Sequence, residues 1–318
     1  MQTIEFSNGD RMPALGLGTW KSEPGEVGAA VTEALRIGYR HFDCATIYGN
    51  EAEIGDAFQR ALDEGVVQRD DLWVTSKLWC NAHRADAVVP AIRESIERLR
   101  VEYLDLYLVH WPVAVKEGVM GPSDPSEFYS LDEVPLAETW DGMEQAAELG
   151  LARHIGVSNY SSKKLGGLLE RRFPPEMDQV ELHPYLQQSE LFAHAKEHGV
   201  AVTAYSPLGS SDRPEGLREA DEPVLLEDPA LAAIAERVGA TPAQVLIAWA
   251  LQRGTAVIPK SVNPERLAQN FAAAEITLPE GAMADLAAMD RRRRYVTGAF
   301  WAARGGPYPV EELWDEPA

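Results

Sequence analysis

Residues 72–110, LWVTSKLWCNAHRADAVVPAIRESIERLRVEYLDLYLVH, decide the fold. Two short apolar runs, LWVTSK at 72–77 and DLYLVH at 105–110, flank the longer amphipathic segment AVVPAIRESIERL at 87–99. Apolar strands separated by a helix of this length are typical of a βαβ unit, in which the two strands lie parallel in one sheet. The stretch therefore predicts an α/β protein with a parallel sheet.

The same alternation continues on both sides of this unit. Amphipathic stretches occur at 26–38 and 138–150. The further apolar runs are ALGLG (14–18), HFDC (41–44), HIGVS (154–158), MDQVEL (177–182), VAVTAYS (200–206) and AVIPK (256–260). About eight strand and helix units, with no Pro/Gly-rich linker between them, fit one closed (β/α)8 TIM barrel of ~250 core residues. We therefore expect residues 1–318 to form a single barrel domain.

The segments outside this alternation are expected at the two ends of the barrel. Asn8-Gly9-Asp10 lies between two short extended runs, which predicts an N-terminal β-hairpin cap. Residues 112–134, 209–228 and the tail 291–318 are variable insertions that follow strand ends or the last helix. Because barrel active sites lie beside such loops, we expect these insertions to gather over the active-site face.

Composition excludes several classes of protein. The apolar stretches are far shorter than the ~20 residues of a membrane span, and residues 1–10 lack the features of a signal peptide, so a cytoplasmic protein is expected. Cys44 and Cys80 form neither a disulfide framework nor a zinc motif, which predicts no metal. A net charge of -21 disfavours nucleic acid and anionic membranes and favours a monomer.

A Rossmann dinucleotide fold is also excluded. Gly16-Leu17-Gly18 is the one Gly-rich match to its fingerprint, but Lys21 stands where the third glycine belongs. No acidic residue follows at the distance of ~20 residues that ribose binding requires.

Four polar residues fall at or just after the ends of three consecutive predicted strands. Asp43 and Tyr48 follow the second strand, Lys77 ends the third and His110 ends the fourth. Each alone is consistent with an ordinary structural residue. Because the carboxyl ends of barrel strands converge on one mouth, their joint position favours a shared catalytic site.

The chemistry of these four groups favours the same interpretation. A tyrosine with an ordinary pKa of ~10 is a poor acid at neutral pH unless a neighbouring cation favours its ionised form. Lys77 is the candidate cation for Tyr48, and Asp43 is the counter-ion that a lysine near the barrel core needs. His110 is expected to hydrogen-bond the substrate oxygen, so that it and Tyr48 together polarise a carbonyl.

Six motifs spread along the chain resemble signatures of the aldo-keto reductase family. They are GYRHFDCATIYGNEAEIG (38–55), VTSKLW (74–79), LVHWP (108–112), GVSNY (156–160), AYSPLGSSDRP (204–214) and IPKSVNPERLAQN (258–270). The resemblance extends from the hairpin to residue 290. It implies a (β/α)8 barrel, an extended NAD(P)H across the carboxyl ends of the strands, and hydride transfer to a carbonyl carbon while Tyr48 donates a proton.

The resemblance also assigns individual residues. The family's catalytic tetrad falls on Asp43, Tyr48, Lys77 and His110. Ser158, Asn159 and Gln179 match contacts to the nicotinamide carboxamide, and Tyr205 matches the ring that stacks on the nicotinamide and leaves one face open to substrate. Lys21 and Asp212 match a latch over the cofactor. The remaining cofactor positions that the resemblance implies are Thr19, Trp20, Asp43, Leu208, Val262 and, at the adenine, Gln269 and Asn270.

Two segments are suited to bind phosphate. Ser206-Pro-Leu-Gly-Ser210 offers backbone N–H groups and hydroxyls to a pyrophosphate. Lys260, Ser261 and Arg266 would surround a dianionic 2′-phosphate, which predicts NADPH as cofactor and weaker binding of NADH. A structural ion pair of Arg266 with Glu265 or with another residue of its helix is the alternative.

Aromatic residues are expected to form the substrate pocket. Trp20, Trp79 and Trp111 each follow a strand end, and the tail adds Phe300 and Trp301. Together with Tyr48 and His110 they would bind a small carbonyl compound. Two rival functions stay open: a cofactor-binding sensor or structural protein of the same fold, and a class I aldolase that uses Lys77 as a Schiff-base nucleophile.

Overall fold

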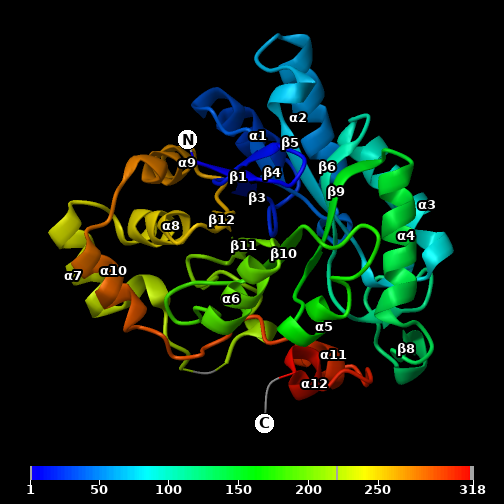
Figure 1. Ribbon diagram of the computed structural model, residues 1–318. Helices are drawn as coiled ribbons and strands as arrows, with labels where there is room; N and C mark the ends of the chain where they lie inside the picture. Colours follow the sequence, from blue (N-terminus) through cyan, green and yellow to red (C-terminus); the bar gives the residue numbers. More distant parts are fainter. Residues whose placement is uncertain (1, 220, 316–318) are drawn as a thin grey trace.

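The barrel is the central feature of the chain, for which the computed structural model describes residues 2–219 and 221–315 (Figure 1). Eight parallel strands form one curled sheet in the order β12-β11-β10-β9-β6-β5-β4-β3. Parallel bridges from Leu15 to Val257 and from Gly18 to Lys260 join its two edges. The eight strands are β3 (Leu17–Gly18), β4 (His41–Asp43), β5 (Trp73–Leu78), β6 (Leu104–Val109), β9 (Ala152–Ser158), β10 (Met177–Glu181), β11 (Ala201–Tyr205) and β12 (Ala256–Val257). The predicted (β/α)8 fold is confirmed.

Helices pack around the sheet. They are α1 (Glu26–Ile37), α2 (Glu51–Asp63), α3 (Ala85–Leu99), α4 (Leu136–Glu148), α5 (Ser162–Gly166), α6 (Ser189–Glu197), α7 (Pro229–Val238), α8 (Pro242–Gln252), α9 (Pro264–Ala272), α10 (Glu280–Ala287), α11 (Ala299–Ala303) and α12 (Val310–Trp314). In α3 the spacing of the buried residues Val88, Ile92, Ser95 and Leu99 places them on one helical face. Among residues 2–219 and 221–315, no single helix is long and apolar enough to cross a membrane. Only the pair α7 and α8, which is bent by 82°, reaches the length and apolar composition of a membrane span.

Short 3-10 helices connect many of these elements. They are η1 (Thr46–Tyr48), η2 (Arg69–Asp71), η3 (Cys80–Ala82), η4 (Pro125–Glu127), η5 (Glu215–Leu217), η6 (Leu225–Glu227) and η7 (Ala273–Glu275). The first of them matters for function, because it turns the chain after β4 and presents Tyr48 at the carboxyl end of the barrel.

Helices α8 and α9 each begin with a side-chain cap. Thr241 and Asn263 accept backbone N–H groups at the start of α8 and α9, and each cap is followed by a proline in the first helical position. A proline is favourable there because its missing N–H would have no partner in the helix. Both caps line the pocket described below.

The predicted hairpin closes the amino-terminal end of the barrel. Strands β1 (Thr3–Glu5) and β2 (Arg11–Pro13) pair antiparallel. Phe6 and Met12 pack with Trp73 and other residues at the starts of the barrel strands. The hairpin thus covers the end of the barrel that lies opposite the strand ends carrying the predicted site.

The other end of the barrel is covered by two of the predicted insertions. In 112–134, strands β7 (Ala114–Val115) and β8 (Phe128–Tyr129) form a small ribbon, and the tail 291–315 with α11 and α12 lies beside it (Figure 1). The two segments share an apolar cluster with Trp79 and Trp111. Gly298 permits this contact, because a Cβ there would lie 2.3 Å from Leu313 and 3.2 Å from Trp111. Residues 220 and 316–318, within the predicted insertions 209–228 and 291–318, lie outside the described residues.

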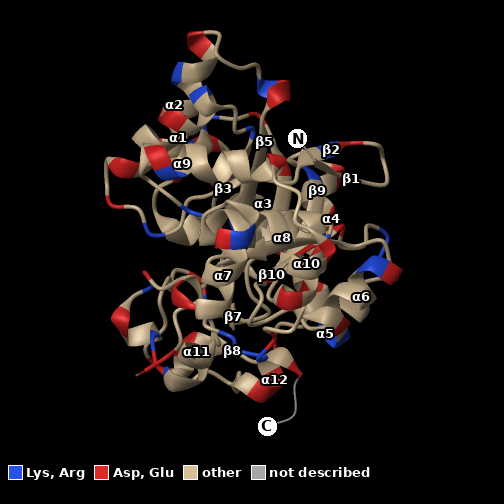
Figure 2. Cartoon of the chain, turned by 90° about the vertical axis from the view of Figure 1, so that its left-hand side faces the viewer, with Lys and Arg blue, Asp and Glu red and all other residues tan. Residues whose placement is uncertain are grey.

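Acidic residues are spread over the outer helices and loops, with basic residues among them (Figure 2). Much of this surface is locally paired, as in the bridges of Arg100 with Asp56 and of Arg237 with Asp285. Because many of the surface charges are paired in this way, a cation in a cavity that has no ion-pair partner indicates a site for an anionic ligand.

Candidate active site

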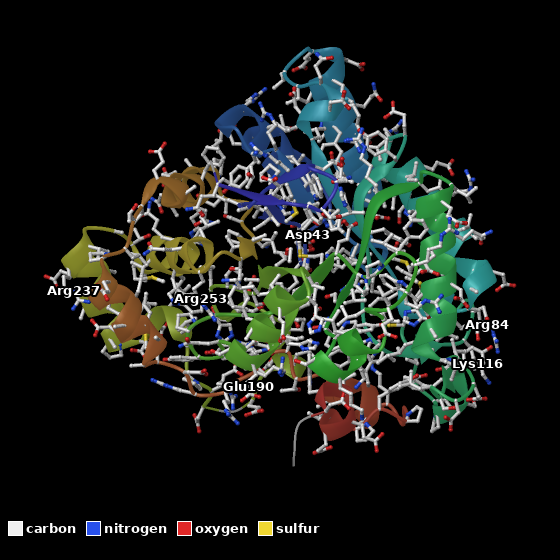
Figure 3. All side chains as sticks on the ribbon, in the orientation of Figure 1. Asp43, Arg84, Lys116, Glu190, Arg237 and Arg253 are labelled. Atoms are coloured by element: carbon white, nitrogen blue, oxygen red, sulfur yellow. The ribbon has the colours of Figure 1, made fainter. Side chains whose placement is uncertain are left out.

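A cavity of about 1010 Å³ opens at the carboxyl ends of the barrel strands. Figure 3 shows Asp43 among the strands at the centre of the molecule, whereas Lys116 and Arg237 lie at its periphery. Apart from Lys77, every residue that the sequence predicted for catalysis, cofactor or substrate lines this cavity: Thr19, Trp20, Lys21, Asp43, Tyr48, Trp79, His110, Trp111, Ser158, Asn159, Gln179, Tyr205, Ser206, Leu208, Ser210, Asp212, Lys260, Ser261, Val262, Arg266, Gln269, Asn270, Phe300 and Trp301.

Lys77 lies directly behind the cavity wall and has no exposed surface. Its Nζ donates to Asp43 Oδ1 at 2.5 Å and to the Cys44 carbonyl at 2.9 Å. Burial is the largest single effect on Lys77 and pushes its pKa down, but the charge and hydrogen bond of Asp43, together with the neighbouring Tyr48 and Cys44, outweigh it, so the pKa lies above its usual range. The buried amine is therefore a protonated, ion-paired cation, with Asp43 as the counter-ion that the sequence suggested.

Tyr48 stands between this cation and the cavity. The Lys77 Nζ donates to the Tyr48 hydroxyl oxygen at 3.4 Å. Burial raises the pKa of Tyr48 to about 12, although the charge of Lys77 lowers it. The sequence predicts that Lys77 makes Tyr48 a better acid; the cation does act in that direction, but desolvation has the larger effect on the pKa in this structure. The Tyr48 hydroxyl is therefore protonated at neutral pH.

His110 faces Tyr48 across the cavity. Its ring lies 5.8 Å from that of Tyr48 and 5.2 Å from that of Trp79, edge to face in both cases. Burial, helped by the charge of Lys77, holds the pKa of His110 well below its usual range. The imidazole is therefore neutral, which suits a hydrogen-bond donor to a substrate oxygen rather than a proton source.

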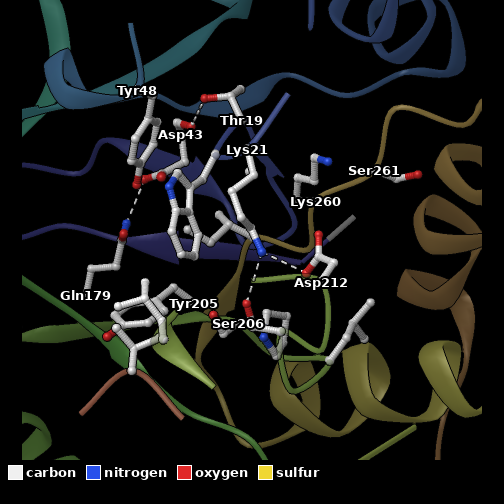
Figure 4. A pocket seen from close by; sticks show the side chains of 18 of the residues that line it. Thr19, Lys21, Asp43, Tyr48, Gln179, Tyr205, Ser206, Asp212, Lys260 and Ser261 are labelled. Atoms are coloured by element: carbon white, nitrogen blue, oxygen red, sulfur yellow. Dashed lines mark hydrogen bonds and ion pairs between the residues drawn. The ribbon is translucent and has the colours of Figure 1, made fainter. Parts of the chain in front are cut away.

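A connected set of polar side chains forms the floor next to these groups. Gln179 donates to Asp43 Oδ2 at 2.7 Å (Figure 4), and Ser158 donates to the Gln179 carbonyl at 2.8 Å. Asn159 donates to the His110 carbonyl at 2.9 Å and accepts the Tyr205 hydroxyl at 2.7 Å. The predicted carboxamide contacts and the predicted stacking ring are thus held in place by one another.

The predicted latch spans the cavity. Lys21 donates to Asp212 at 2.7 Å (Figure 4) and to Ser210 at 3.3 Å. Burial lowers the pKa of Lys21, although Asp212 opposes the shift. Lys21 follows β3 and Asp212 follows β11, so this ion pair joins two loops above the opening.

Two cations stand at the amino-terminal end of α9. Lys260 is partly buried, Arg266 is exposed, and Ser261 lies between them in sequence. Among the described residues neither cation forms an ion pair, so the alternative pairing of Arg266 with Glu265 is absent. Unpaired cations beside a helix amino terminus are suited to bind an anion.

Aromatic rings wall the part of the cavity next to the tetrad. Trp79 and Trp301 lie 5.7 Å apart, and Trp111 and Phe300 lie 5.6 Å apart. Trp79 also donates its indole N–H to the Met120 carbonyl at 2.8 Å, which fixes the loop after β7 against the opening. Trp20 lies 6.5 Å from Tyr48 on the other side.

Several lining residues were not predicted from the sequence. They include Ile47, Met120, Val296, Arg304 and the segment 241–243 at the start of α8. The Thr241-Pro-Ala-Gln244 capping box marks a helix start in the sequence, but it gives no sign that this helix begins at the pocket. Met120, Val296 and Arg304 belong to loops whose path is fixed only by tertiary contacts.

The fold and the site together define a (β/α)8 barrel with a buried Asp–Lys–Tyr group and a histidine at its carboxyl-terminal face. The model of the Aldo/keto reductase family matches residues 14–291. The chain is 54% identical over 317 residues to the Aldo/keto reductase slr0942 of Synechocystis sp., covering 99% of this chain and 97% of that protein. It is 47% identical over 296 residues to the human Aldo-keto reductase family 1 member A1, covering 92% and 90% of the two chains. The chicken protein of that name is 46% identical over 309 residues, covering 96% and 94%.

The chain therefore belongs to the aldo/keto reductase family. It is an oxidoreductase that acts on carbonyl and alcohol groups of small molecules with a nicotinamide cofactor.

Proposed function

We propose that the protein is an NADPH-dependent carbonyl reductase that converts an aldehyde, a ketone or an aldose to the alcohol. One observation carries this proposal: a neutral His110 and a protonated Tyr48 face the same aromatic-walled cavity that also contains the unpaired cations Lys260 and Arg266. The first pair is suited to a carbonyl oxygen and the second to a phosphate.

The residues of the cavity fit NADPH. Lys260, Ser261 and Arg266 would hold the 2′-phosphate, and the turn from Ser206 to Ser210 would hold the pyrophosphate. Positive φ angles at both of these serines and at the glycine between them support a turn that exposes backbone N–H groups. When bound, NADPH supplies the hydride. NADH lacks the 2′-phosphate, so it is expected to bind more weakly.

The remaining chemistry belongs to the side chains of the protein. The Tyr48 hydroxyl donates a hydrogen bond to the carbonyl oxygen of the substrate and transfers its proton to that oxygen as the alcohol forms. The neutral imidazole of His110 donates a second hydrogen bond to the same oxygen. The Lys77 cation stabilises the tyrosinate that the transfer leaves, and Asp43 keeps Lys77 protonated.

The structure gives no support to the aldolase alternative. A Schiff-base lysine must lose its proton and reach a carbonyl carbon. Lys77 has a raised pKa, is paired with Asp43 and has no exposed surface. The other alternative, a cofactor-binding sensor of the same fold, would be supported if the protein bound NADPH but reduced no carbonyl compound.

We also propose that residues 1–318 act as one barrel domain and as a cytoplasmic monomer, with no nucleic-acid or membrane partner. In the described ranges the exposed large apolar side chains are Val66, Met120 and Leu149, which come from separate segments. A contiguous apolar patch of the kind that marks a stable interface is not formed by such isolated residues. Light scattering after size-exclusion chromatography tests the monomer, and a dimer mass would refute it.

The activity test follows the loss of reduced-nicotinamide absorbance with a panel of aldehydes and ketones, with NADPH and NADH in parallel. Turnover with NADPH preferred supports the proposal. Tight NADPH binding without turnover on any carbonyl would support the sensor instead.

A further inference from the structure

Strand β10 presents two polar side chains on the same face, because residues two apart on a strand point the same way. Gln179 reaches Asp43 in the tetrad. Glu181, two residues later at the end of the strand, is completely buried and forms no hydrogen bond with a tetrad residue in the described structure. A carboxylate buried this deeply needs strong partners.

The partners of Glu181 come mainly from the start of the carboxyl-terminal tail. Its Oε1 accepts the backbone N–H of Tyr295 and its Oε2 accepts that of Val296, both at 2.7 Å. The His183 Nε2 lies 2.8 Å from Oε1. Burial pushes the pKa of Glu181 up, but the interactions with His183, the hydrogen bond from the Tyr295 N–H and the nearby charge of Arg294 together outweigh burial, and the pKa lies below its usual range. Glu181 is thus an ionised anchor for two consecutive backbone groups of the tail.

The tail segment that follows this anchor forms one wall of the substrate end of the cavity. Val296, Phe300 and Trp301 all line the cavity. Gly298 lets the chain turn tightly against Trp111, and Trp314 donates to the Thr297 carbonyl at 2.7 Å. The direction in which the chain leaves Glu181 therefore determines where these apolar side chains stand relative to the tetrad.

We propose that Glu181 is a specificity-positioning residue. By fixing the backbone at Tyr295 and Val296, it sets the apolar wall that binds bulky, aromatic carbonyl substrates, while small aldehydes need no such wall. This inference rests on the proposed carbonyl reductase function. It assigns Glu181 no contact with the reacting atoms.

Glu181→Gln tests the proposal with 4-nitrobenzaldehyde and propanal as the two substrates. The amide keeps one acceptor oxygen and turns an NH2 group toward the other backbone N–H, so the anchor is lost without a large change in volume. We expect KM for 4-nitrobenzaldehyde to rise by ~10-fold or more, with kcat/KM for propanal and Kd for NADPH changed by less than ~3-fold. An equal loss for both aldehydes would overturn the proposal.

Asp105→Asn is the matched control. Asp105 is also buried, accepts the Val74 backbone N–H at 2.9 Å and pairs with Arg69 at 2.8 Å, but it lies at the amino-terminal end of β6, away from the tail. It should reduce stability without changing the ratio of the two aldehyde activities. If Asp105→Asn alters that ratio as much as Glu181→Gln, the effect reflects general destabilisation and the proposal fails.

Hydrogen exchange supplies a readout that does not depend on activity, and its decisive measurement is made on the wild-type protein. In the wild-type protein the amides of Tyr295 and Val296 should exchange far more slowly than that of Ala299, an exposed residue whose N–H is bonded only to the Thr297 hydroxyl at 3.2 Å. In Glu181→Asp, which keeps the charge but shortens the reach, their protection should fall partway. Fast exchange of both amides in the wild type would refute the anchor. If the wild type reduces neither aldehyde, the proposed function fails, while the exchange result still decides whether Glu181 holds the tail.

Discussion

Gln179 and Lys77 share the carboxylate of Asp43: the amide donates to Oδ2 at 2.7 Å and the amine to Oδ1 at 2.5 Å. The three residues come from β10, β5 and β4, so one buried carboxylate connects three strands of the barrel. The same carboxylate keeps the cation beside Tyr48 protonated. In the proposed mechanism, stability and catalysis therefore depend on the same side chain.

Asp43→Asn should be strongly destabilising. Removing one partner of a buried ion pair leaves the other charge without compensation, and such changes cost about 3–5 kcal/mol. Urea denaturation of both proteins measures the difference. Asp212→Asn is the control. The Asp212 side chain is 60% exposed, so its ion pair with Lys21 should contribute less than about 1 kcal/mol to the free energy of unfolding. Equal losses in the two variants would contradict this account of Asp43.

Tyr48→Phe should leave NADPH binding nearly unchanged and reduce turnover by at least ~10²- to 10⁴-fold, the contribution of a positioned general acid. Fluorescence titration and steady-state kinetics separate the two effects. Tyr107→Phe is the control, because Tyr107 is fully buried away from the cavity and its hydroxyl has no hydrogen-bond partner among the described residues, whereas Tyr48 is partly buried and lines the cavity. Turnover that survives in Tyr48→Phe would remove Tyr48 as the proton donor.

Arg266→Ala should weaken NADPH much more than NADH. Loss of one charge-assisted hydrogen bond to a phosphate corresponds to ~10- to 100-fold in Kd, whereas NADH has no 2′-phosphate to lose. The Kd values for both cofactors measure the difference. Arg237→Ala, at an exposed arginine on α7 that pairs with Asp285, should change neither. Similar losses for both cofactors would count against the 2′-phosphate assignment.

His154 should make stability fall as the pH rises. It lies 3.0 Å from Asp10 in the hairpin and 2.9 Å from Glu176. Burial lowers its pKa, but the two carboxylates outweigh burial, so the folded-state pKa lies above the ordinary 6.5. A raised pKa means that the stabilisation is fully present below the ordinary value and is lost as the pH rises through the folded value.

Chemical denaturation near pH 6 and near pH 9 should therefore show a less stable wild type at the higher pH, where a histidine of ordinary or moderately raised pKa is neutral. His154→Gln should remove most of this difference. An unchanged pH dependence in the variant would assign the effect to another group.

Much of the site could be predicted because the barrel ties local sequence to place. A polar residue at the end of a short apolar run must lie at the mouth where the strand ends converge, which is why Tyr48 and His110 were found together. The roles of these residues and the assignment of one domain stay predictions. Arg304 and Val296 could not be found in this way, since they lie in a tail without a repeating pattern.

The sequence by itself determined the order of strands and helices, the closed parallel barrel, the hairpin and the family, because hydrophobic periodicity and motif spacing are properties of nearby residues. Only the tertiary structure decided that burial outweighs Lys77 at Tyr48, that Arg266 is unpaired, and that Glu181 holds the tail 115 residues away. Desolvation and long-range hydrogen bonds depend on what surrounds a group in space. No local pattern encodes those surroundings.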